Sequence, residues 1–372
     1  MILFTPRWCL RRLGAWALAA GLATLGLGQT AHAGTQEQSS LAQVIDDYAA
    51  AHDFSGTILV SRDEEILYRH GIGLAERAFE TPAGVDTRYR IASITKLFTA
   101  TLVLQLVDEG RIDLSDPIGT YLPTYAGDRS IPLYSLLNHT SGLPNPDSEI
   151  TFEMAVTEGI PLYQSPHDTD ALLDEYASGA PMRSPGEAFD YSNADYIVLG
   201  KIVEAVSGES FEAVLQHRIL GPLNLADTGM IRQRDVIPRL ASTYLRLSED
   251  EPLINDLPVL MENWYAAGAM YSTVDDVGRF ADALYEGRLL RPGTLDAMLT
   301  PGLDEYGYGL WIWDQRAGDR SFRAAVRFGG VMGANAVLYR ILDEDITIVI
   351  LGNTNASDMG DFAHRIATTL LN

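Results

Sequence analysis

The chain of 372 residues contains a single cysteine, Cys9, and only seven histidines. Cys9 lies in an N-terminal segment that we expect to be removed, so the mature chain should have neither a disulfide nor a thiol nucleophile. The histidines are scattered and form no His-Glu-x-x-His pattern or His/Cys cluster, so neither a metal site nor a cofactor is predicted. Stability must therefore come from a hydrophobic core, which a chain of this length can build.

The first 33 residues are predicted to be a bacterial signal peptide. They combine three arginines with an apolar stretch over residues 13–27 and a small-x-small site at Ala31-His32-Ala33. This stretch is shorter than the roughly 20 residues that a membrane-spanning helix needs, so cleavage after Ala33 is favoured over a retained anchor. The pair Arg11-Arg12 allows twin-arginine export, but its flanking residues favour ordinary secretion. We therefore expect a periplasmic or secreted protein.

Basic residues are also few: 27 of them face 50 acidic ones, which gives a formal net charge of −23. Loss of the three arginines of the signal would take this charge to −26. A surface of this sign repels phosphate backbones and anionic lipids, so neither nucleic acid nor a membrane is an expected partner. The expected partner is a small-molecule substrate.

Hydrophobic patterns predict strands at the two ends of the chain and helices in its middle. Strands are predicted over residues 56–62, 65–70, 322–328, 334–341 and 346–351, with flanking helices over 37–52 and 360–371. Helices that are apolar on nearly every side are predicted over residues 93–109, 193–206 and 272–286. The pattern indicates an α+β fold in which both chain ends build one sheet and a helical region is inserted between them.

We expect residues 34–372 to form one catalytic unit with two lobes. The sheet lobe would comprise about residues 34–92 and 305–372, and the helical lobe about residues 93–304. A groove between two such lobes is the expected place for a ligand.

Lysine is rarer still, with Lys96 and Lys201 as the only two beside 25 arginines. Lys96 closes the segment Ser93-Ile94-Thr95-Lys96, and positions three apart lie on one face of a helix. A lysine amine can give up its proton when it is desolvated, whereas a guanidinium stays protonated. We therefore predict that Lys96 activates the hydroxyl of Ser93 as a nucleophile.

A second candidate element is the segment Tyr191-Ser192-Asn193, which opens a predicted helix after a Pro-Gly turn. Tyr191 and Asn193 are two residues apart and can both point into a cleft. A phenol near an ammonium group can relay a proton, and the amide of Asn193 could hold Lys96 or a substrate carbonyl. The alternative is that Tyr191 is a packed aromatic residue and Asn193 a helix cap.

These segments together resemble the penicillin-recognising serine hydrolases, which comprise class C β-lactamases, DD-peptidases and their esterase relatives. The resemblance covers about residues 40–371 and keeps the order of the family's motifs. The matching segments are Ser93–Lys96, the His-Thr-Ser-Gly-Leu stretch within Leu136–Leu143, Tyr191–Tyr196 and Ala267–Asp276.

The resemblance implies a β-lactamase/transpeptidase-like fold with a helix-flanked antiparallel sheet. It implies that Ser93 is a nucleophile that forms an acyl-enzyme, that Lys96 and Tyr191 act as base and proton relay, and that Asn193 is a polar partner. The substrate would be a small ester, amide, β-lactam or peptide.

The third motif of the family, Lys-Thr/Ser-Gly or His-x-Gly on a strand, is replaced here by Phe328-Gly329-Gly330. Arg327 is adjacent, but neighbouring strand residues face opposite sides, so Arg327 is not expected to replace the missing cation. Phe328 is expected to face the cleft and, with Gly329 and Gly330, to contact the substrate. The backbone N–H groups of Ser93 and Val331 are expected to form an oxyanion hole.

An apolar Phe328 in the cleft favours an esterase or amidase that prefers substrates without a carboxylate. The alternatives are a β-lactamase or D-Ala-D-Ala carboxypeptidase and, in another class, a penicillin-binding or scaffold protein without turnover. His139 is expected to be structural, and Trp311 and Trp313 to line the core or the cleft wall. The chain has no Gly-x-Ser-x-Gly segment, which argues against an α/β-hydrolase.

Overall fold

A computed structural model describes residues 29–146 and 150–372, with only the backbone described for residues 29–36. Most of the predicted signal, including Cys9, lies outside these residues. The predicted cleavage site lies where α1 (Gln29–Ala51) begins. Within the described ranges, no helix is both long and apolar enough to cross a membrane.

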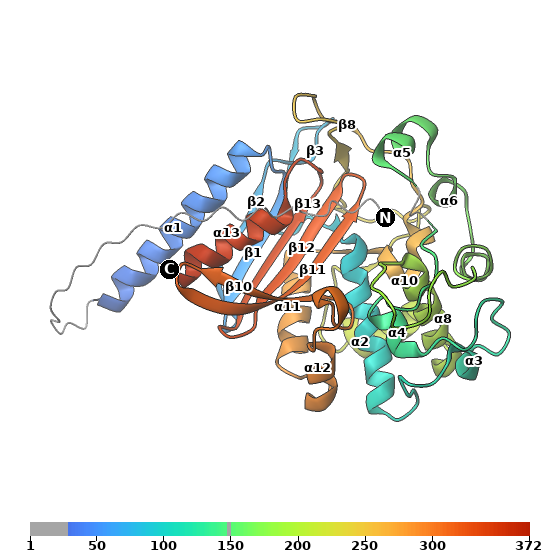
Figure 1. Cartoon of the computed structure of the whole chain (residues 1–372). Coiled ribbons are helices and arrows are strands. Elements are labelled where there is room, and N and C mark those ends of the chain that lie inside the picture. Colours follow the sequence, from blue (N-terminus) through green and yellow to red (C-terminus); the bar gives the residue numbers. More distant parts are fainter. Residues whose placement is uncertain (1–28, 147–149) are drawn as a thin grey trace.

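The central element is a six-stranded antiparallel sheet to which both ends of the chain contribute, as predicted (Figure 1). Its strand order is β10-β11-β12-β13-β1-β2. The strands are β1 (Gly56–Arg62), β2 (Glu65–Ile72), β10 (Trp311–Ala317), β11 (Arg320–Val331), β12 (Ala334–Ile341) and β13 (Ile346–Gly352). The N-terminal strand β1 pairs with the last strand β13, from Gly56 opposite Gly352 to Arg62 opposite Ile346.

Strand β10 was not expected from the sequence. It is an edge strand of the sheet, and its burial is irregular: Ile312 and Ala317 are buried, Asp314 and Arg316 are exposed, and the remaining residues are half-buried. Two tryptophans followed by polar residues gave too weak an alternation to predict it.

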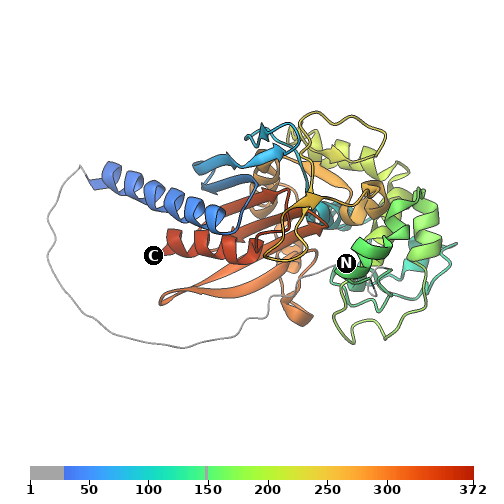
Figure 2. The same ribbon diagram turned by 90° about the horizontal axis from the view of Figure 1, so that it is seen from above.

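One face of the sheet is covered by α1 and α13 (Met359–Leu371), which lie side by side in both views (Figures 1 and 2). Apolar side chains of both helices, among them Leu41, Ile45, Phe362 and Ile366, pack against side chains of the sheet, among them Ile58, Val337, Ile348 and Ile350. Helix α13 is capped by Asp358, whose carboxylate accepts hydrogen bonds from the N–H groups of Gly360 and Asp361. We call this side of the sheet the terminal-helix face.

The other face of the sheet packs against the helical middle of the chain. The main helices there are α2 (Thr95–Asp108), α8 (Asn193–Ser207), α10 (Tyr265–Gly268) and α11 (Val274–Tyr285). The rings of Phe98 in α2 and Phe280 in α11 stack at 3.7 Å between centroids. Helix α8 begins at its N-cap Ser192 and ends at Gly208, which adopts the left-handed conformation that glycine tolerates.

Shorter elements complete the helical middle and its borders. The helices are α3 (Ile118–Tyr121), α4 (Leu133–Leu137), α5 (Phe152–Glu158), α6 (Pro161–Gln164), α7 (Thr169–Ala171), α9 (Phe211–Leu215) and α12 (Pro292–Met298). Single helical turns are η1 (Ala92–Ile94), η2 (Leu172–Tyr176), η3 (Gln216–Leu220), η4 (Met261–Trp264) and η5 (Leu303–Glu305). Small sheets pair β3 (Leu74–Glu76) with β4 (Thr81–Pro82), β9 (Met270–Ser272) with β5 (Tyr89–Arg90) and β6 (Gly229–Met230), and β7 (Tyr244–Leu245) with β8 (Ile254–Asn255).

We expect Ile350→Ala to lower the free energy of unfolding by about 2–5 kcal/mol, because Ile350 is fully buried between the sheet and its terminal helices. The matched control is Ile66→Ala on edge strand β2, where the side chain is 47% exposed and the loss should stay within about 0.5 kcal/mol. Denaturant unfolding of both variants measures the difference. Equal losses would show that the terminal-helix face is not part of the core.

Candidate active site

Ser93 lies in the single turn η1 that leads from β5 into α2. The preceding residue, Ala92, is fully buried and has a positive φ of 44°, which a residue with a side chain rarely adopts. Such backbone strain persists only where the surrounding structure imposes it. At the start of a helical turn the N–H of Ser93 has no partner inside the turn, so it can face a ligand.

Lys96 is fully buried and holds the hydroxyl of Ser93 together with two carbonyl oxygens. Its Nζ lies 3.1 Å from Ser93 Oγ, 2.7 Å from Asn193 Oδ1 and 2.9 Å from the backbone oxygen of Ala267. The structure therefore brings together Ser93, Lys96 and Asn193, which the sequence singled out. It adds the carbonyl of Ala267, which no side-chain pattern could have indicated.

The carbonyl of Ala267 is presented by α10, whose first residue Tyr265 has a φ of 43°. The neighbouring carbonyl of Ala266 accepts a hydrogen bond from Thr99 Oγ1 at 2.7 Å, one turn after Lys96 on α2. Helices α2 and α10 are thus joined at two successive carbonyls, which fixes the position of Lys96 Nζ.

Tyr191 reaches this group from the segment that precedes α8. Its neighbour Asp190 donates a backbone hydrogen bond to His139 O at 2.8 Å, and the N–H of Asn193 binds Asn145 Oδ1 at 3.0 Å. These bonds on either side fix the segment, and the ring of Tyr191 lies over Lys96 Nζ at 4.8 Å from its centroid. The hydroxyl of Tyr191 accepts a hydrogen bond from Arg327.

Arg327 therefore lies in the candidate site, contrary to the expectation from the sequence. Its guanidinium is 1% exposed and donates from Nε to Ser93 O at 2.7 Å and from Nη1 to the hydroxyl of Tyr306 at 2.6 Å. Its third bond, from Nη2, is the one to Tyr191. Strand β11 therefore does place a cation, Arg327, beside Ser93 and Tyr191.

Phe328 faces away from the site, so the expectation that it points into the cleft is wrong. Its ring packs with the terminal-helix face, beside Gly360 of α13. Strand residues do alternate, but the alternation has the opposite phase: Arg327 and Gly329 face the helical middle, and Phe328 does not. Both faces of β11 are covered, so its sequence shows no polar and apolar alternation that could set the phase.

Gly329 is the point at which β11 touches η1. A Cβ atom built on Gly329 would lie 2.1 Å from Ile91 O and 3.3 Å from Ile94 N, so no side chain fits there. On Gly330 a Cβ atom would meet nothing within 4 Å among the described residues. Close approach of the strand to the turn that carries Ser93 thus requires glycine only at residue 329.

The strand register argues against Val331 as an oxyanion donor and favours Gly330. Val331 pairs with Ala334 across the two-residue turn Met332–Gly333, and residues that flank such a turn exchange their backbone hydrogen bonds with each other. The N–H of Val331 therefore points toward β12. The N–H of Gly330 points to the other edge, where β10 pairing has already stopped at Val326.

His139 lies directly beneath Tyr191, with 4.2 Å between the ring centroids. It is fully buried, and its Nδ1 is 2.8 Å from Asp195 Oδ2, while Ser141 donates to the other carboxylate oxygen. Burial raises the pKa of Asp195 well above its ordinary value and lowers the pKa of His139 well below its own. The pair therefore shares a proton without carrying a net positive charge, which suits a supporting role.

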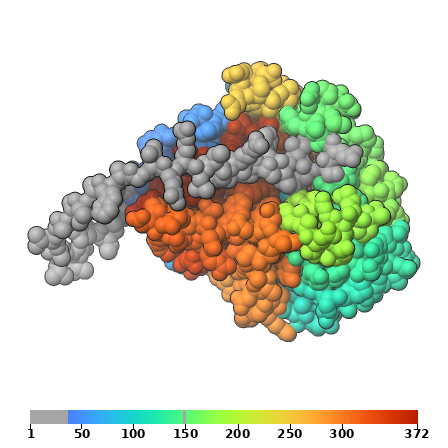
Figure 3. Space-filling view, in the orientation of Figure 1, coloured from blue at the N-terminus to red at the C-terminus, as the bar shows by residue number. Residues whose placement is uncertain are grey.

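The two tryptophans of β10 are two residues apart, so both leave the same face of the strand, and their ring centroids lie 6.3 Å from each other and 6.1 and 5.8 Å from that of Phe328. Trp313 packs with the terminal-helix face. Trp311 lies parallel to the ring of Tyr191 at 6.2 Å and meets Tyr306 edge to face at 4.7 Å. On the side of the molecule seen in Figure 3, the surface of residues around 310–330 borders that of residues around 180.

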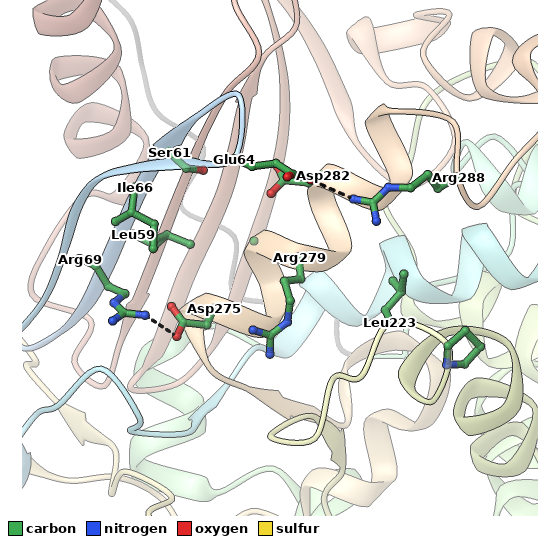
Figure 4. Close-up of a pocket in the computed structure, with 12 residues that line it drawn as sticks. Leu59, Ser61, Glu64, Ile66, Arg69, Leu223, Asp275, Arg279, Asp282 and Arg288 are labelled. Carbon is green, nitrogen blue, oxygen red and sulfur yellow. Dashed lines mark hydrogen bonds and ion pairs between the residues drawn. The ribbon is translucent and has the colours of Figure 1, made fainter.

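A cavity of about 420 Å³ lies elsewhere, between the β1–β2 hairpin and α11 (Figure 4). Its charged side chains pair with one another: Arg69 lies 3.0 Å from Asp275 and Arg288 lies 3.6 Å from Glu64. None of the candidate catalytic residues lines it. Across the described part of the chain, no group of His, Cys, Asp or Glu side chains could hold a metal ion.

Three contributors to the site were missed from the sequence: Arg327, Tyr306 and Asp195. Tyr306 stands in a Gly- and Tyr-rich segment without a recognisable period, and only the structure brings it to Arg327. Asp195 follows Asn193 by two residues, and its charge in an apolar helix was the one signal that could have pointed to a buried partner.

A search against protein families matches the Beta-lactamase family over residues 41–371. The chain is 31% identical over 273 residues to PbpX, a penicillin-binding-like protein of Bacillus subtilis, which covers 73% of this chain and 65% of PbpX. The chain thus spans slightly less than two thirds of that relative.

Two further similarities extend over more of the relatives' length. Esterase EstB of Burkholderia gladioli is 30% identical over 338 residues, which cover 80% of this chain and 85% of EstB. A solved structure of a D-stereospecific amidohydrolase from Streptomyces sp. superposes with a TM-score of 0.74 at 27% identity, covering 89% of this chain and 97% of that one.

We expect Gly329→Ala to cost about 1–3 kcal/mol of stability, because the new methyl group must push β11 away from η1. It should also slow the reaction of Ser93 with a small acylating probe. Gly330→Ala is the matched control and should leave both properties near their wild-type values. Equal behaviour of the two variants in denaturant unfolding and in probe labelling would contradict the assigned contact.

Proposed function

Because the chain belongs to the Beta-lactamase family and is a serine hydrolase, we propose that it cleaves an ester or amide bond through an acyl-enzyme on Ser93. Lys96 and Tyr191 would act as base and proton relay, and Asn193 would hold Lys96. The observation that carries this proposal is the arrangement of the three oxygens around Lys96 Nζ.

Two of these oxygens, Asn193 Oδ1 and Ala267 O, can only accept hydrogen bonds. A neutral amine has two N–H groups and one lone pair, so it can donate to both carbonyl oxygens and turn its lone pair toward the hydroxyl of Ser93. The same geometry suits the ammonium form, which donates to all three oxygens. Lys96 can therefore take the proton of Ser93 and return it without moving.

In the proposed reaction, Ser93 Oγ attacks the substrate carbonyl carbon while its proton passes through Lys96 to the deprotonated oxygen of Tyr191. Tyr191, which lies over Lys96 Nζ and at the edge of the site, then delivers a proton to the leaving oxygen or nitrogen as the scissile bond breaks. Water then attacks the acyl carbon and gives a proton to the same pair. The pair passes this proton to Ser93 Oγ as the acyl–oxygen bond breaks, which releases the acid and restores Ser93. Both half-reactions conserve the proton count of the site.

The developing oxyanion would be held by the backbone N–H groups of Ser93 and Gly330. The first lies at the start of a helical turn, and the second lies on the stretch of β11 beyond Val326, where β10 no longer pairs. Donors fixed in the backbone need no rearrangement as charge develops, which is why they stabilise a transition state efficiently.

We propose a preference for substrates without a carboxylate, but for a different reason from the one suggested by Phe328. All three nitrogens of Arg327 are engaged within the protein, so the cation on β11 is not presented to a ligand. The names of Esterase EstB and of the D-stereospecific amidohydrolase support an ester or amide substrate. Hydrolysis of β-lactams or D-Ala-D-Ala peptides, and acylation without turnover, are the competing outcomes of the test below.

The remaining elements of the proposal concern where the enzyme acts. We propose export by the N-terminal signal, with cleavage after Ala33, to the periplasm or the medium. The mature protein, residues 34–372, would work as one catalytic unit on small molecules, without nucleic acid or a stable membrane anchor.

An acylating active-site probe should add its mass to the peptide that contains Ser93, and turnover of a short p-nitrophenyl ester should vanish in Ser93→Ala. Lys96→Arg should lose nearly as much activity, because arginine keeps the charge but cannot exchange the proton. A chromogenic cephalosporin assayed in parallel should be turned over less well than the ester.

Label on Ser141 or another residue would show that the nucleophile is misassigned. Substantial activity in Lys96→Arg would reduce Lys96 to a fixed charge. Efficient cephalosporin turnover would favour a β-lactamase, and a stable adduct with every substrate would favour a binding protein.

Tyr191→Phe should lower kcat by about 10²–10⁴-fold, the usual effect of losing a general acid–base group, with little change in melting temperature. The melting temperature should fall only slightly, because phenylalanine keeps the ring contacts of Tyr191 with His139 and Trp311 and loses only the hydrogen bond from Arg327. A large loss of stability with a modest kinetic effect would support a packing role instead.

A further inference from the structure

Arg327 is bound entirely by groups of the protein itself. Its guanidinium bridges three oxygens on separate elements: Ser93 O in η1, the hydroxyl of Tyr191 before α8, and the hydroxyl of Tyr306 before β10. With a side chain 1% exposed, it has almost no surface left for a substrate. A lysine at this position would have a single nitrogen and could not span the three oxygens as a planar fork does.

Tyr306 is the fixed end of this bridge. It is fully buried, its backbone N–H donates to Leu303 O at 3.1 Å, and its backbone oxygen accepts from Gly302 N at 2.9 Å. A bridge to Trp311 joins it to the start of β10. Burial raises the pKa of Tyr306 above its ordinary value, so Tyr306 binds Arg327 as a neutral hydroxyl and does not neutralise the charge of the guanidinium.

We infer that Arg327 and Tyr306 are positioning residues for Tyr191: Tyr306 anchors the guanidinium, which holds the hydroxyl of Tyr191 and favours its deprotonated form. This inference rests on the proposed function of the site and goes beyond it, because it takes Arg327 out of substrate recognition. The positive charge of Arg327 on β11 acts on Tyr191 and not on the substrate.

The surroundings of Tyr191 agree with a need for negative charge at its oxygen. Two buried cations face Tyr191, and the carboxyl group of Asp195, which shares a proton with His139, lies behind it. The groups that face this cluster are Lys96 from α2, His139 after α4, Asp195 and Tyr196 from α8, Tyr306 before β10 and Arg327 from β11. Arginine cannot release its proton, so a proton lost from Tyr191 balances the excess of positive charge.

The test compares Tyr306→Phe with Tyr339→Phe. Tyr339 lies on β12, is also buried, packs on the terminal-helix face, and its hydroxyl has no partner among the described residues. Both proteins are assayed with two esters that differ by one carboxylate, p-nitrophenyl butyrate and the mono-p-nitrophenyl ester of glutaric acid. Melting temperature is recorded for each variant.

We expect Tyr306→Phe to lower kcat roughly tenfold to a hundredfold for both esters, as misplacement of a catalytic group does, with KM and the ratio of the two esters nearly unchanged. The acid limb of the pH profile of kcat/KM should move to higher pH, because the cation that favours deprotonated Tyr191 is held less well. Arg327→Met, which removes the charge, should move the acid limb further in the same direction. Tyr339→Phe should match the wild type.

A selective rise of KM for the anionic ester in either variant would overturn the inference, since it would show that Arg327 binds a carboxylate. Loss of melting temperature without movement of the acid limb would also overturn it in favour of simple packing. Ultraviolet titration of tyrosinate is independent of turnover. The signal of Tyr191 is the difference between each protein and the same protein carrying Tyr191→Phe, and it should show Tyr191 ionising at higher pH in both variants than in the wild type. If wild type shows no Ser93-dependent turnover, the proposed function fails, and this titration alone decides the inference.

Discussion

The contact between Gly329 of β11 and the backbone of Ile91 is the constraint on which the site depends. At this contact the backbone of the sheet, which both chain ends build, packs directly against the backbone that leads into η1, the turn that carries Ser93. Arg327, two residues earlier on the same strand, then reaches Ser93 O, and Gly330 follows with a free backbone edge. A larger residue at 329 would separate the proposed nucleophile, Ser93, from both Arg327 and the proposed oxyanion donor.

Around this contact, the site is built from buried polar groups that hydrogen-bond with one another and with the backbone. Lys96 and Arg327 each bind three oxygens, and Asp195 binds His139 and Ser141. Buried charges are tolerated only when they are paired and hydrogen-bonded, so such a network holds its members in one geometry. The strained backbone at Ala92 and Tyr265 lies at both ends of the network, which indicates where that geometry is imposed.

Much of this arrangement could be read from the sequence, because local patterns carry it. Alternating apolar runs predicted five of the six strands of the sheet, and Ser93–Lys96 at helical spacing predicted the pair that the structure joins at 3.1 Å. What could not be read depends on contacts between distant segments. The facing of β11 was assigned the wrong way round because both of its faces are covered, and Tyr306 reaches Arg327 only through the path of the loop before β10.

The pairing of β1 with β13 has a consequence for when the enzyme becomes active. Gly56 lies opposite Gly352, so the sheet closes only when residues almost 300 positions apart meet. Long-range pairings of this kind form late, since their loop-closure entropy must be overcome before the contacts contribute. Strand β11, which carries Arg327 and Gly329, belongs to the last quarter of the chain. A chain that emerges from its amino end therefore presents Ser93 long before the partners of Ser93 arrive, and the proposed nucleophile stays inactive until the carboxyl end has been made.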